Sequence, residues 1–315
     1  MPLELNYREL WGHESMLRDT VRCEAFRQAL FDVVTPESVV LDIGAGTGIL
    51  SVFAAQAGAR SVYAVERTAI AQFAEHLVAD NGFSDRITVI QGEMEDLELP
   101  EKVDIIVSEW LGGYAVDENL LPIVIQARDR WLKPEGKMIP GITTSWMAPA
   151  YDAYLQEDVA FWKSQPYGVN LAAVARDALR RTESTCNHIK QKHLSCDPQM
   201  LWTIDSHTCT PQQASGTFET ELEFVSTREG GVNILAAWFK TLSAEKVVLS
   251  NGPSYPDTHW GRTVFPIGKT VPVNTGTRIK VHFVHDPHGK GRSKAKWTVE
   301  IDGYRFQSED TTELT

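Results

Sequence analysis

The stretch VVLDIGAGTGILS at residues 39–51 decides the fold class. A short apolar run, Val39–Ile43, leads directly into a G-x-G-x-G turn and then into a helical pattern. Glycines in such a turn adopt positive φ and let the backbone approach a ligand. The dinucleotide version of the turn needs a glycine where this chain has Ile49. The tighter spacing after acidic Asp42 favours S-adenosylmethionine, whose amine would pair with a carboxylate; the alternative is a tight strand-to-helix turn that binds nothing.

Strand-like and helix-like segments alternate on both sides of this stretch up to about residue 140. Such alternation is typical of βαβ units around a parallel sheet. We therefore predict an α/β fold with a Rossmann-like domain over residues 37–140, preceded by a helical segment over residues 1–36 whose apolar residues have helical spacing from His13 to Asp32. The expected strands are Val39–Ile43, Ser61–Val65, Ile87–Gln91 and Val103–Ser108, and the expected helices are Ile49–Ala57, Ala69–Asn81 and Leu120–Trp131.

The chain changes character at Pro140-Gly141, shortly after the turn-like Lys133-Pro134-Glu135-Gly136. Several antiparallel strands at this spacing predict a sandwich or barrel over residues 141–315. Between about 164 and 206 the sequence is polar, partly helical over Leu171–Arg181, and shows no strong strand, so we expect an arm inserted into the β domain. The expected strands include Thr217–Phe224, Val232–Thr241, Arg278–Val284 and Lys296–Ile301.

Composition narrows the classes of function. The 315 residues carry 42 Asp+Glu against 30 Lys+Arg, a formal charge of −12, and 43% are hydrophobic. Packed cores are therefore expected, nucleic acid is disfavoured as a partner, and a cationic substrate would be attracted. The N-terminal MPLELNYREL has no secretory pattern, and the longest weakly polar run makes a poor membrane span. These features predict a cytoplasmic protein with no membrane partner.

Four cysteines are sparse for this length, so we expect no disulfide framework and predict reduced thiols. Cys186, His188, His193 and Cys196 have the residue types of a zinc site, but their spacing fits no common zinc pattern. We favour a structural role for this cluster and expect no metal.

Two acidic positions follow the second and third strands. Glu66, 24 positions beyond Asp42, can accept the two ribose hydroxyls of an adenosine group. Met94 would then pack on the adenine ring, with Glu95 near its amino group. The alternative for Glu93-Met94-Glu95-Asp96 is a solvated acidic turn.

The fourth strand ends in Ser108-Glu109-Trp110 and a loop that reaches Glu118 nine residues after the first glutamate. Two glycines in this loop would let it fold back as a hairpin. Both carboxylates could then grip one planar cation, and a guanidinium has the fixed fork of N–H donors that suits such a clamp. An acidic loop ahead of a helix N-terminus is the alternative.

Taken together, these motifs resemble the protein arginine methyltransferase family, from about residue 7 to 305. The resemblance is carried by His13-Glu14-x-Met16-Leu17-x-Asp19-x-x-Arg22, LDIGAGTGILS, Glu66, Ser108-Glu109-Trp110 with Glu118, and Thr258-His259-Trp260. It implies a Rossmann-like S-adenosylmethionine-dependent methyltransferase domain, a β-barrel with an inserted helical arm, and a ring-shaped head-to-tail homodimer. It also implies the type I class, which forms asymmetric products.

The resemblance assigns roles residue by residue. Glu109 and Glu118 are the expected guanidinium clamp, and His259 with its acidic partner Asp19 completes the catalytic set. Arg22 is expected to bind the carboxylate of the cofactor. The remaining cofactor-binding positions are His13, Asp42, Gly44, Gly46, Gly48, Glu66, Met94 and Glu95, and the expected substrate-binding positions are Tyr7, Met16, Trp110, Tyr114 and Trp260.

Three positions depart from the family pattern: Leu3 and Gly113 stand where tyrosines are common, and Leu120 stands where methionine is common. The last two border the substrate rather than the cofactor. The sequence therefore predicts methyl transfer to a guanidino nitrogen of arginine in proteins or peptides. Free L-arginine or another small guanidino metabolite is the alternative substrate, and a non-catalytic activating partner of another methyltransferase is a minor alternative.

Overall fold

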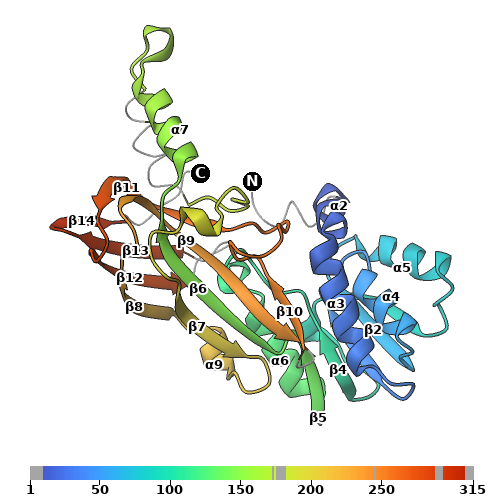
Figure 1. Cartoon of the computed structure of the whole chain (residues 1–315). Helices are drawn as coiled ribbons and strands as arrows, with labels where there is room; N and C mark the ends of the chain where they lie inside the picture. The colour runs from blue at the N-terminus through green and yellow to red at the C-terminus, as the bar shows by residue number, and fades with distance from the viewer. Residues whose placement is uncertain (1–9, 172–173, 175–181, 244–245, 288–293, 309–315) are drawn as a thin grey trace.

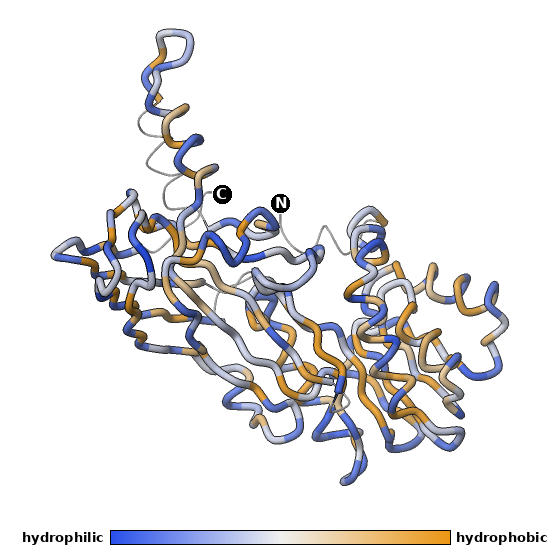
Figure 2. Tube along the Cα trace, viewed as in Figure 1, coloured by the Kyte–Doolittle hydropathy of each residue, from blue (hydrophilic) through white to orange (hydrophobic). Residues whose placement is uncertain are grey.

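The computed structural model describes residues 10–171, 174, 182–243, 246–287 and 294–308. A five-stranded parallel sheet in the order β3-β2-β1-β4-β5 forms the first domain (Figure 1). The central strand β1 is buried along its whole length, and its sequence is apolar except for Asp42. Figure 2 shows hydrophobic residues along the strands of this domain. The strands are β1 (Val39–Ile43), β2 (Ser61–Glu66), β3 (Ile87–Gln91), β4 (Val103–Val107) and β5 (Leu132–Ile139).

The helices of this domain fall within two residues of their predicted bounds. They are α4 (Ile49–Gln56), α5 (Ala71–Asp80) and α6 (Leu121–Trp131), with short 3-10 turns η1 (Met94–Asp96) and η2 (Val116–Glu118). Strand β5 was not predicted, because Lys133-Pro134-Glu135-Gly136 reads as a turn. This strand pairs on one side only, with β4, and an edge strand tolerates a proline.

The N-terminal segment forms two helices rather than one, α2 (Leu10–Arg18) and α3 (Thr20–Val33). The break falls at Asp19, whose side chain accepts a hydrogen bond from the backbone N–H of Arg22 and so caps α3. Helix α3 packs on α4 and on β5, which fixes the N-terminal segment against the parallel-sheet domain.

The second domain consists of two antiparallel sheets, in the orders β10-β9-β6-β7 and β14-β13-β12-β8, with β11 also paired to β9. Side-chain bonds join the sheets: Thr220 to the Leu201 carbonyl, and Tyr304 to the Ile267 carbonyl. Apolar residues of both sheets, among them Trp202, Phe224, Phe265 and Phe283, share one buried cluster, which is consistent with the predicted barrel. The strands are β6 (Ile142–Ala150), β7 (Gln199–Asp205), β8 (Phe218–Val225), β9 (Gly230–Ser243), β10 (Val247–Ser250), β11 (Thr263–Val273), β12 (Arg278–Asp286), β13 (Lys294–Ile301) and β14 (Tyr304–Gln307), with a short helix α9 (Pro211–Ala214) after β7.

The arm projects from the barrel as α7 (Ala153–Lys163) and η3 (Pro166–Gly168) (Figure 1). It begins about ten residues earlier than predicted. The predicted end at 206 is also wrong, because Glu183 already pairs with Val264 on the barrel, and η4 (Gln191–His193) and β7 follow there. Most of the helix expected over Leu171–Arg181 lies outside the described residues.

Candidate active site

A cavity of about 360 Å³ opens where β1, β2 and β4 end, the edge at which open α/β sheets bind ligands. Its volume falls in the range of small-molecule sites. The loops after these strands form one wall, and α2 and α3 form another. The structure brings most of the predicted site residues into this lining: His13, Met16, Arg22, Gly44, Gly46, Glu66, Met94, Glu95, Glu109 and Glu118.

The glycine turn after β1 has two uses. Gly44 and Gly46 line the cavity with φ of 71° and 56°, and a Cβ on Gly46 would lie 3.0 Å from the His13 ring. Gly46 therefore lets α2 close over the turn. Gly48 was predicted to bind the cofactor, but it lies outside the lining. Its φ of 86° starts α4, and its Cβ would lie 3.2 Å from Ala74 Cβ, so it serves helix packing.

Asp42 also differs from its predicted role. Its side chain is fully buried beneath the turn and lies outside the cavity lining. One carboxyl oxygen accepts a hydrogen bond from the Ser51 hydroxyl at 2.7 Å. Burial raises the pKa of Asp42 to about 7, so much of it is neutral near neutral pH and it does not supply a full charge to pair an amine.

Glu66 stands at the end of β2 in a fixed orientation. One carboxylate oxygen accepts from the Gly46 N–H at 2.9 Å and the other from the Thr68 N–H at 2.8 Å. Each oxygen keeps acceptor capacity, and the side chain lines the cavity, so it can still bind a diol. Met94 and Glu95 in η1 line the same cavity.

Arg22 is a buried cation on the cavity wall. Its guanidinium donates to Glu109 Oε2 at 3.2 Å, while its buried Nε has no hydrogen-bond partner among the described residues. A buried guanidinium N–H without an acceptor is costly. The cavity therefore suits a ligand with a carboxylate at this end and a diol at the Glu66 end, which the methionine and ribose parts of S-adenosylmethionine provide.

The two glutamates of the predicted clamp share this cavity. Glu109 follows β4, where the Ser108 hydroxyl ties the strand end to the Ile43 carbonyl at 2.9 Å. Its Oε1 accepts from the Leu111 N–H at 2.9 Å, which with Arg22 holds the carboxylate in place. Glu118 ends η2 and lines the cavity as well.

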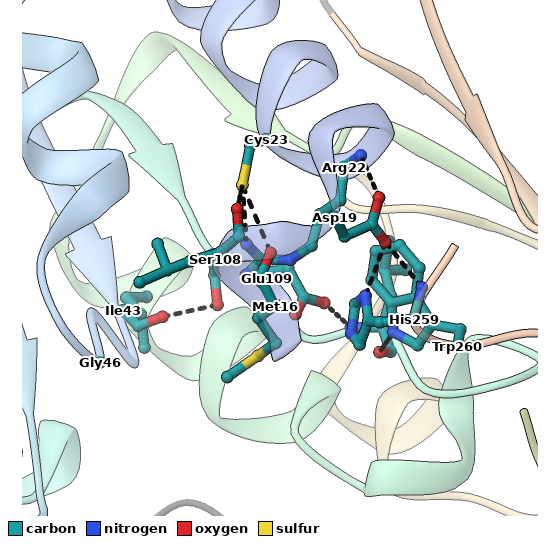
Figure 3. Close-up of polar contacts among 12 residues, drawn as sticks. Met16, Asp19, Arg22, Cys23, Ile43, Gly46, Ser108, Glu109, His259 and Trp260 are labelled. Atoms are coloured by element: carbon teal, nitrogen blue, oxygen red, sulfur yellow. Dashed lines mark hydrogen bonds and ion pairs between the residues drawn. The ribbon is translucent and has the colours of Figure 1, made fainter. Parts of the chain in front are cut away.

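Asp19 joins the N-terminal helices to the barrel. Its Oδ1 caps α3, and its Oδ2 accepts from both the backbone N–H and the Nδ1 of His259, each at 2.8 Å (Figure 3). Burial alone would raise the pKa of Asp19, but these hydrogen bonds bring it below its ordinary value. Because an ionised carboxylate only accepts, Nδ1 of His259 is the donor in this pair, which fixes the orientation of the imidazole ring.

Three predicted substrate-binding residues lie in the interior instead of the cavity wall. Trp110, Tyr114 and Trp260 are 1%, 3% and 6% exposed, and none is in the lining. Trp260 packs on His259 and donates to the Leu111 carbonyl at 2.7 Å. These aromatic residues support the site from behind. Tyr7 lies outside the described residues.

Several lining residues were not predicted. Thr68 lies two residues after Glu66, and Ser108 directly precedes Glu109. Their closeness in sequence to predicted acidic site residues could have indicated that they line the cavity. Ile123 and Val124 on α6 had no signal beyond helical periodicity. In the Cys186, His188, His193 and Cys196 cluster, His188 binds Asp152 at 3.0 Å and His193 accepts from the Lys190 N–H. In the described ranges no three His, Cys, Asp or Glu side chains converge as a metal site.

No helix in the described part of the chain is long and apolar enough to cross a membrane.

A Rossmann-like sheet with a cavity for an adenosyl group and an amino-acid carboxylate defines the class of protein as a methyltransferase. Residues 40–136 match the model of a methyltransferase domain, and residues 143–309 match that of the arginine methyltransferase oligomerization subdomain.

The chain belongs to the protein arginine N-methyltransferase family. It is 36% identical over 285 residues to protein arginine N-methyltransferase 6 of Xenopus laevis, covering 87% of this chain and 83% of the relative. It is 37% identical over 279 residues to protein arginine N-methyltransferase 1 of Schizosaccharomyces pombe, covering 86% and 80%. A chain of the Trypanosoma brucei PRMT1 enzyme-prozyme heterotetrameric complex with AdoHcy superposes with a TM-score of 0.86 at 30% identity, covering 96% of this chain and 100% of that one.

Proposed function

We propose that this chain transfers the methyl group of S-adenosylmethionine to a guanidino nitrogen of arginine in proteins or peptides. The observation that carries the proposal is that Glu109 and Glu118 line the same cavity as Glu66 and Arg22. Free arginine and a non-catalytic role are not favoured, because the relatives compared above are named protein arginine N-methyltransferases and the acidic pair is present.

The residues at the two ends of the cavity would hold the cofactor. Glu66 would accept hydrogen bonds from the ribose hydroxyls, and the Arg22 guanidinium, whose Nε–H has no partner among the described residues, would bind the carboxylate of the methionine part. Met94 would pack against the adenine, and His13 lies over the glycine turn. When bound, S-adenosylmethionine supplies a methyl group already activated by its sulfonium. The protein's main task is then to position the accepting nitrogen.

The two glutamates would position the substrate and adjust its charge. A guanidinium is a poor nucleophile because its lone pairs are delocalised. Glu109 and Glu118 bind its N–H edges, draw positive charge toward the nitrogens they hold, and leave the remaining nitrogen free to react. The proton released on methylation passes to Glu118 or to His259, whose imidazole is oriented by Asp19.

Substitution of the acidic pair tests the clamp. We expect Glu109→Gln and Glu118→Gln each to lower kcat by about 10- to 100-fold, because each removes a charge-assisted pair worth about 1.5–3 kcal/mol. Glu101→Gln is the matched control, since this glutamate pairs with Arg60 on the surface. Near-normal turnover in either clamp variant would contradict the proposed mechanism.

Product analysis tests the substrate class. The purified protein is incubated with labelled S-adenosylmethionine and either an Arg-Gly-rich peptide or free L-arginine, and the products are identified by mass spectrometry. We expect label in the peptide, with asymmetric dimethylarginine among the products. Label in free arginine alone would overturn the proposed substrate.

We also propose that the protein is a head-to-tail homodimer in the cytoplasm. The projecting arm and the match to an oligomerization subdomain support the dimer. Four free cysteines, three of them buried, support a reducing compartment. Cell fractionation with marker proteins tests the location.

A further inference from the structure

The loop from Glu109 to Glu118 follows a strand of the parallel sheet, yet the barrel holds it. Four side chains of the barrel domain form hydrogen bonds with it, and each of these bonds is buried. They are Trp260 Nε1 to the Leu111 carbonyl at 2.7 Å, Asn251 Nδ2 to the Gly113 carbonyl at 2.7 Å, Ser145 Oγ to the Tyr114 carbonyl at 2.8 Å, and His285 Nδ1 with the Tyr114 hydroxyl at 2.9 Å.

The loop contains a strained turn between its two glutamates. Ala115 is fully buried and has φ 82° and ψ −66°, a conformation that non-glycine residues rarely adopt. Its N–H and carbonyl both bond to Gly112. Such a conformation persists only where the surroundings hold it. Because Glu118 follows three residues later, the turn at Ala115 determines where the second carboxylate of the clamp lies.

The Tyr114 side chain anchors the residue next to this turn. Its ring packs among Trp202, Phe265 and Phe283, and its hydroxyl reaches His285, which is 0% exposed. Burial lowers the pKa of His285 to about 4 and raises the pKa of Tyr114 well above its usual 10, so both groups are neutral at pH 7. A neutral hydrogen bond in an apolar core is directional and costly to leave unmade.

Resting on the proposed function, we propose that the Tyr114–His285 hydrogen bond is a positioning contact for methyl transfer. It fixes the strained turn at Ala115 from the barrel and thereby sets Glu118 opposite Glu109. Neither Tyr114 nor His285 lines the cavity, so both act through the loop and not on the substrate.

The first test removes the hydroxyl and keeps the ring. We expect Tyr114→Phe to lower kcat by about tenfold or more and to raise KM for an arginine peptide, because small misplacements of reacting groups have large effects. The Kd for S-adenosylmethionine, measured by calorimetry, stays within about twofold of wild type. Tyr304→Phe is the matched control, since it removes a tyrosine hydroxyl that bonds to the Ile267 carbonyl elsewhere in the barrel.

A second variant separates positioning from stability. In Tyr114→Phe/His285→Leu both polar groups are replaced by apolar ones, which removes the unsatisfied imidazole nitrogen that the single variant leaves. We expect Tm to recover to within about 2 °C of the Tyr304→Phe control while kcat stays low. Recovery of kcat together with Tm would overturn the proposal, as would a kcat for Tyr114→Phe equal to that of the control.

Wild-type protein in the same assay keeps the two proposals apart. If the wild type does not methylate the peptide, the proposed function fails. If the wild type is active and Tyr114→Phe matches the control, only the positioning contact fails.

Discussion

A single carboxylate, Asp19, connects three parts of the site. It breaks the N-terminal segment into two helices, caps the second of them through Arg22, and orients His259 on a barrel loop. This one side chain therefore fixes the position of Arg22, which lines the cavity, relative to the His259 imidazole, which would accept a proton. Sequence reasoning assigned the pairing with His259 through family resemblance; the helix cap became visible only in the structure.

Substitution at Asp19 separates the cap from the charge. Asparagine is as good an N-cap as aspartate, so Asp19→Asn preserves α3 but removes the negative charge beside His259. We expect kcat to fall by about 10- to 100-fold with a small change in Tm. Asp152→Asn is the control, because Asp152 also caps a helix and binds a histidine but does not line the cavity. Equal kcat for both variants would exclude a catalytic role for the Asp19 charge.

Asp42 predicts an unusual pH dependence of stability. Its pKa rises from 3.8 unfolded to about 7 folded, so between these values the folded state holds a proton that the unfolded state releases. Stability from this group is therefore present below about pH 4 and is lost as pH rises toward 7, by on the order of 4 kcal/mol at most. We expect Asp42→Asn to gain in Tm relative to wild type as pH rises from 4 to 8.

Asp104 provides the opposite case within the same sheet. Burial would raise the pKa of Asp104, but hydrogen bonds from Lys133 and the Val39 N–H lower it below its usual value. Asp104→Asn is therefore expected to lose Tm relative to wild type as pH rises. Parallel pH profiles of the two variants would show that the burial of Asp42 does not control its ionisation.

At the scale of elements, the loop after β4 is closely packed at Gly113, one of the positions that depart from the family pattern. A Cβ on Gly113 would lie 2.2 Å from Thr263 Oγ1 on β11. The Asp117 carboxylate also accepts from the N–H groups of Gly113 and Tyr114, each at 3.0 Å, which fixes the backbone there. The tyrosine found one place later, Tyr114, points into the barrel core instead of the cavity.

This packing predicts that a side chain at Gly113 destabilises the protein and that a smaller residue at position 263 reduces the loss. Gly113→Ala is expected to destabilise the protein by about 1–3 kcal/mol, measured by denaturant unfolding, because the added methyl overlaps Thr263. In a Thr263→Ala background the same change should cost less than half as much. Additive effects of the two substitutions would mean that the loop moves away from β11 at little cost.

The elements also show where prediction from sequence succeeds and where it fails. Strands β1 to β4 were predicted to within one residue, because each is a short run rich in β-branched residues between helical or turn segments. Burial alone does not explain this success, since β1 is wholly buried but β3 is mostly half-buried or exposed. Strand β5 was missed because an edge strand tolerates Pro134. Asp42 and Tyr114 were expected to contact ligands but are buried outside the cavity lining. A motif gives the order of residues, but it does not show which side chains are buried in the core. Glu66, Arg22 and the two clamp glutamates line one cavity, and their binding roles stay predictions.

At the scale of the whole molecule, the arm makes the proposed dimer testable. Phe161 and Tyr167 on the arm are 51% and 99% exposed. We expect Phe161→Glu/Tyr167→Glu to shift the protein from dimer to monomer in sedimentation velocity, because buried charge opposes association. Met200→Glu, an exposed apolar position on β7, is the control. An unchanged sedimentation coefficient in the arm variant would exclude these side chains from the interface.

The hydrogen bonds from the barrel to the loop between Glu109 and Glu118 limit how chimeras of such enzymes can be designed. A chimera cut at the domain junction near Pro140 would keep Tyr114 while replacing His285, Asn251 and Ser145 with the residues of another barrel. Its cofactor cavity would survive the exchange, but its acidic pair would lose register. We therefore expect an active chimera to need residues 110–119 and the barrel domain from the same parent protein.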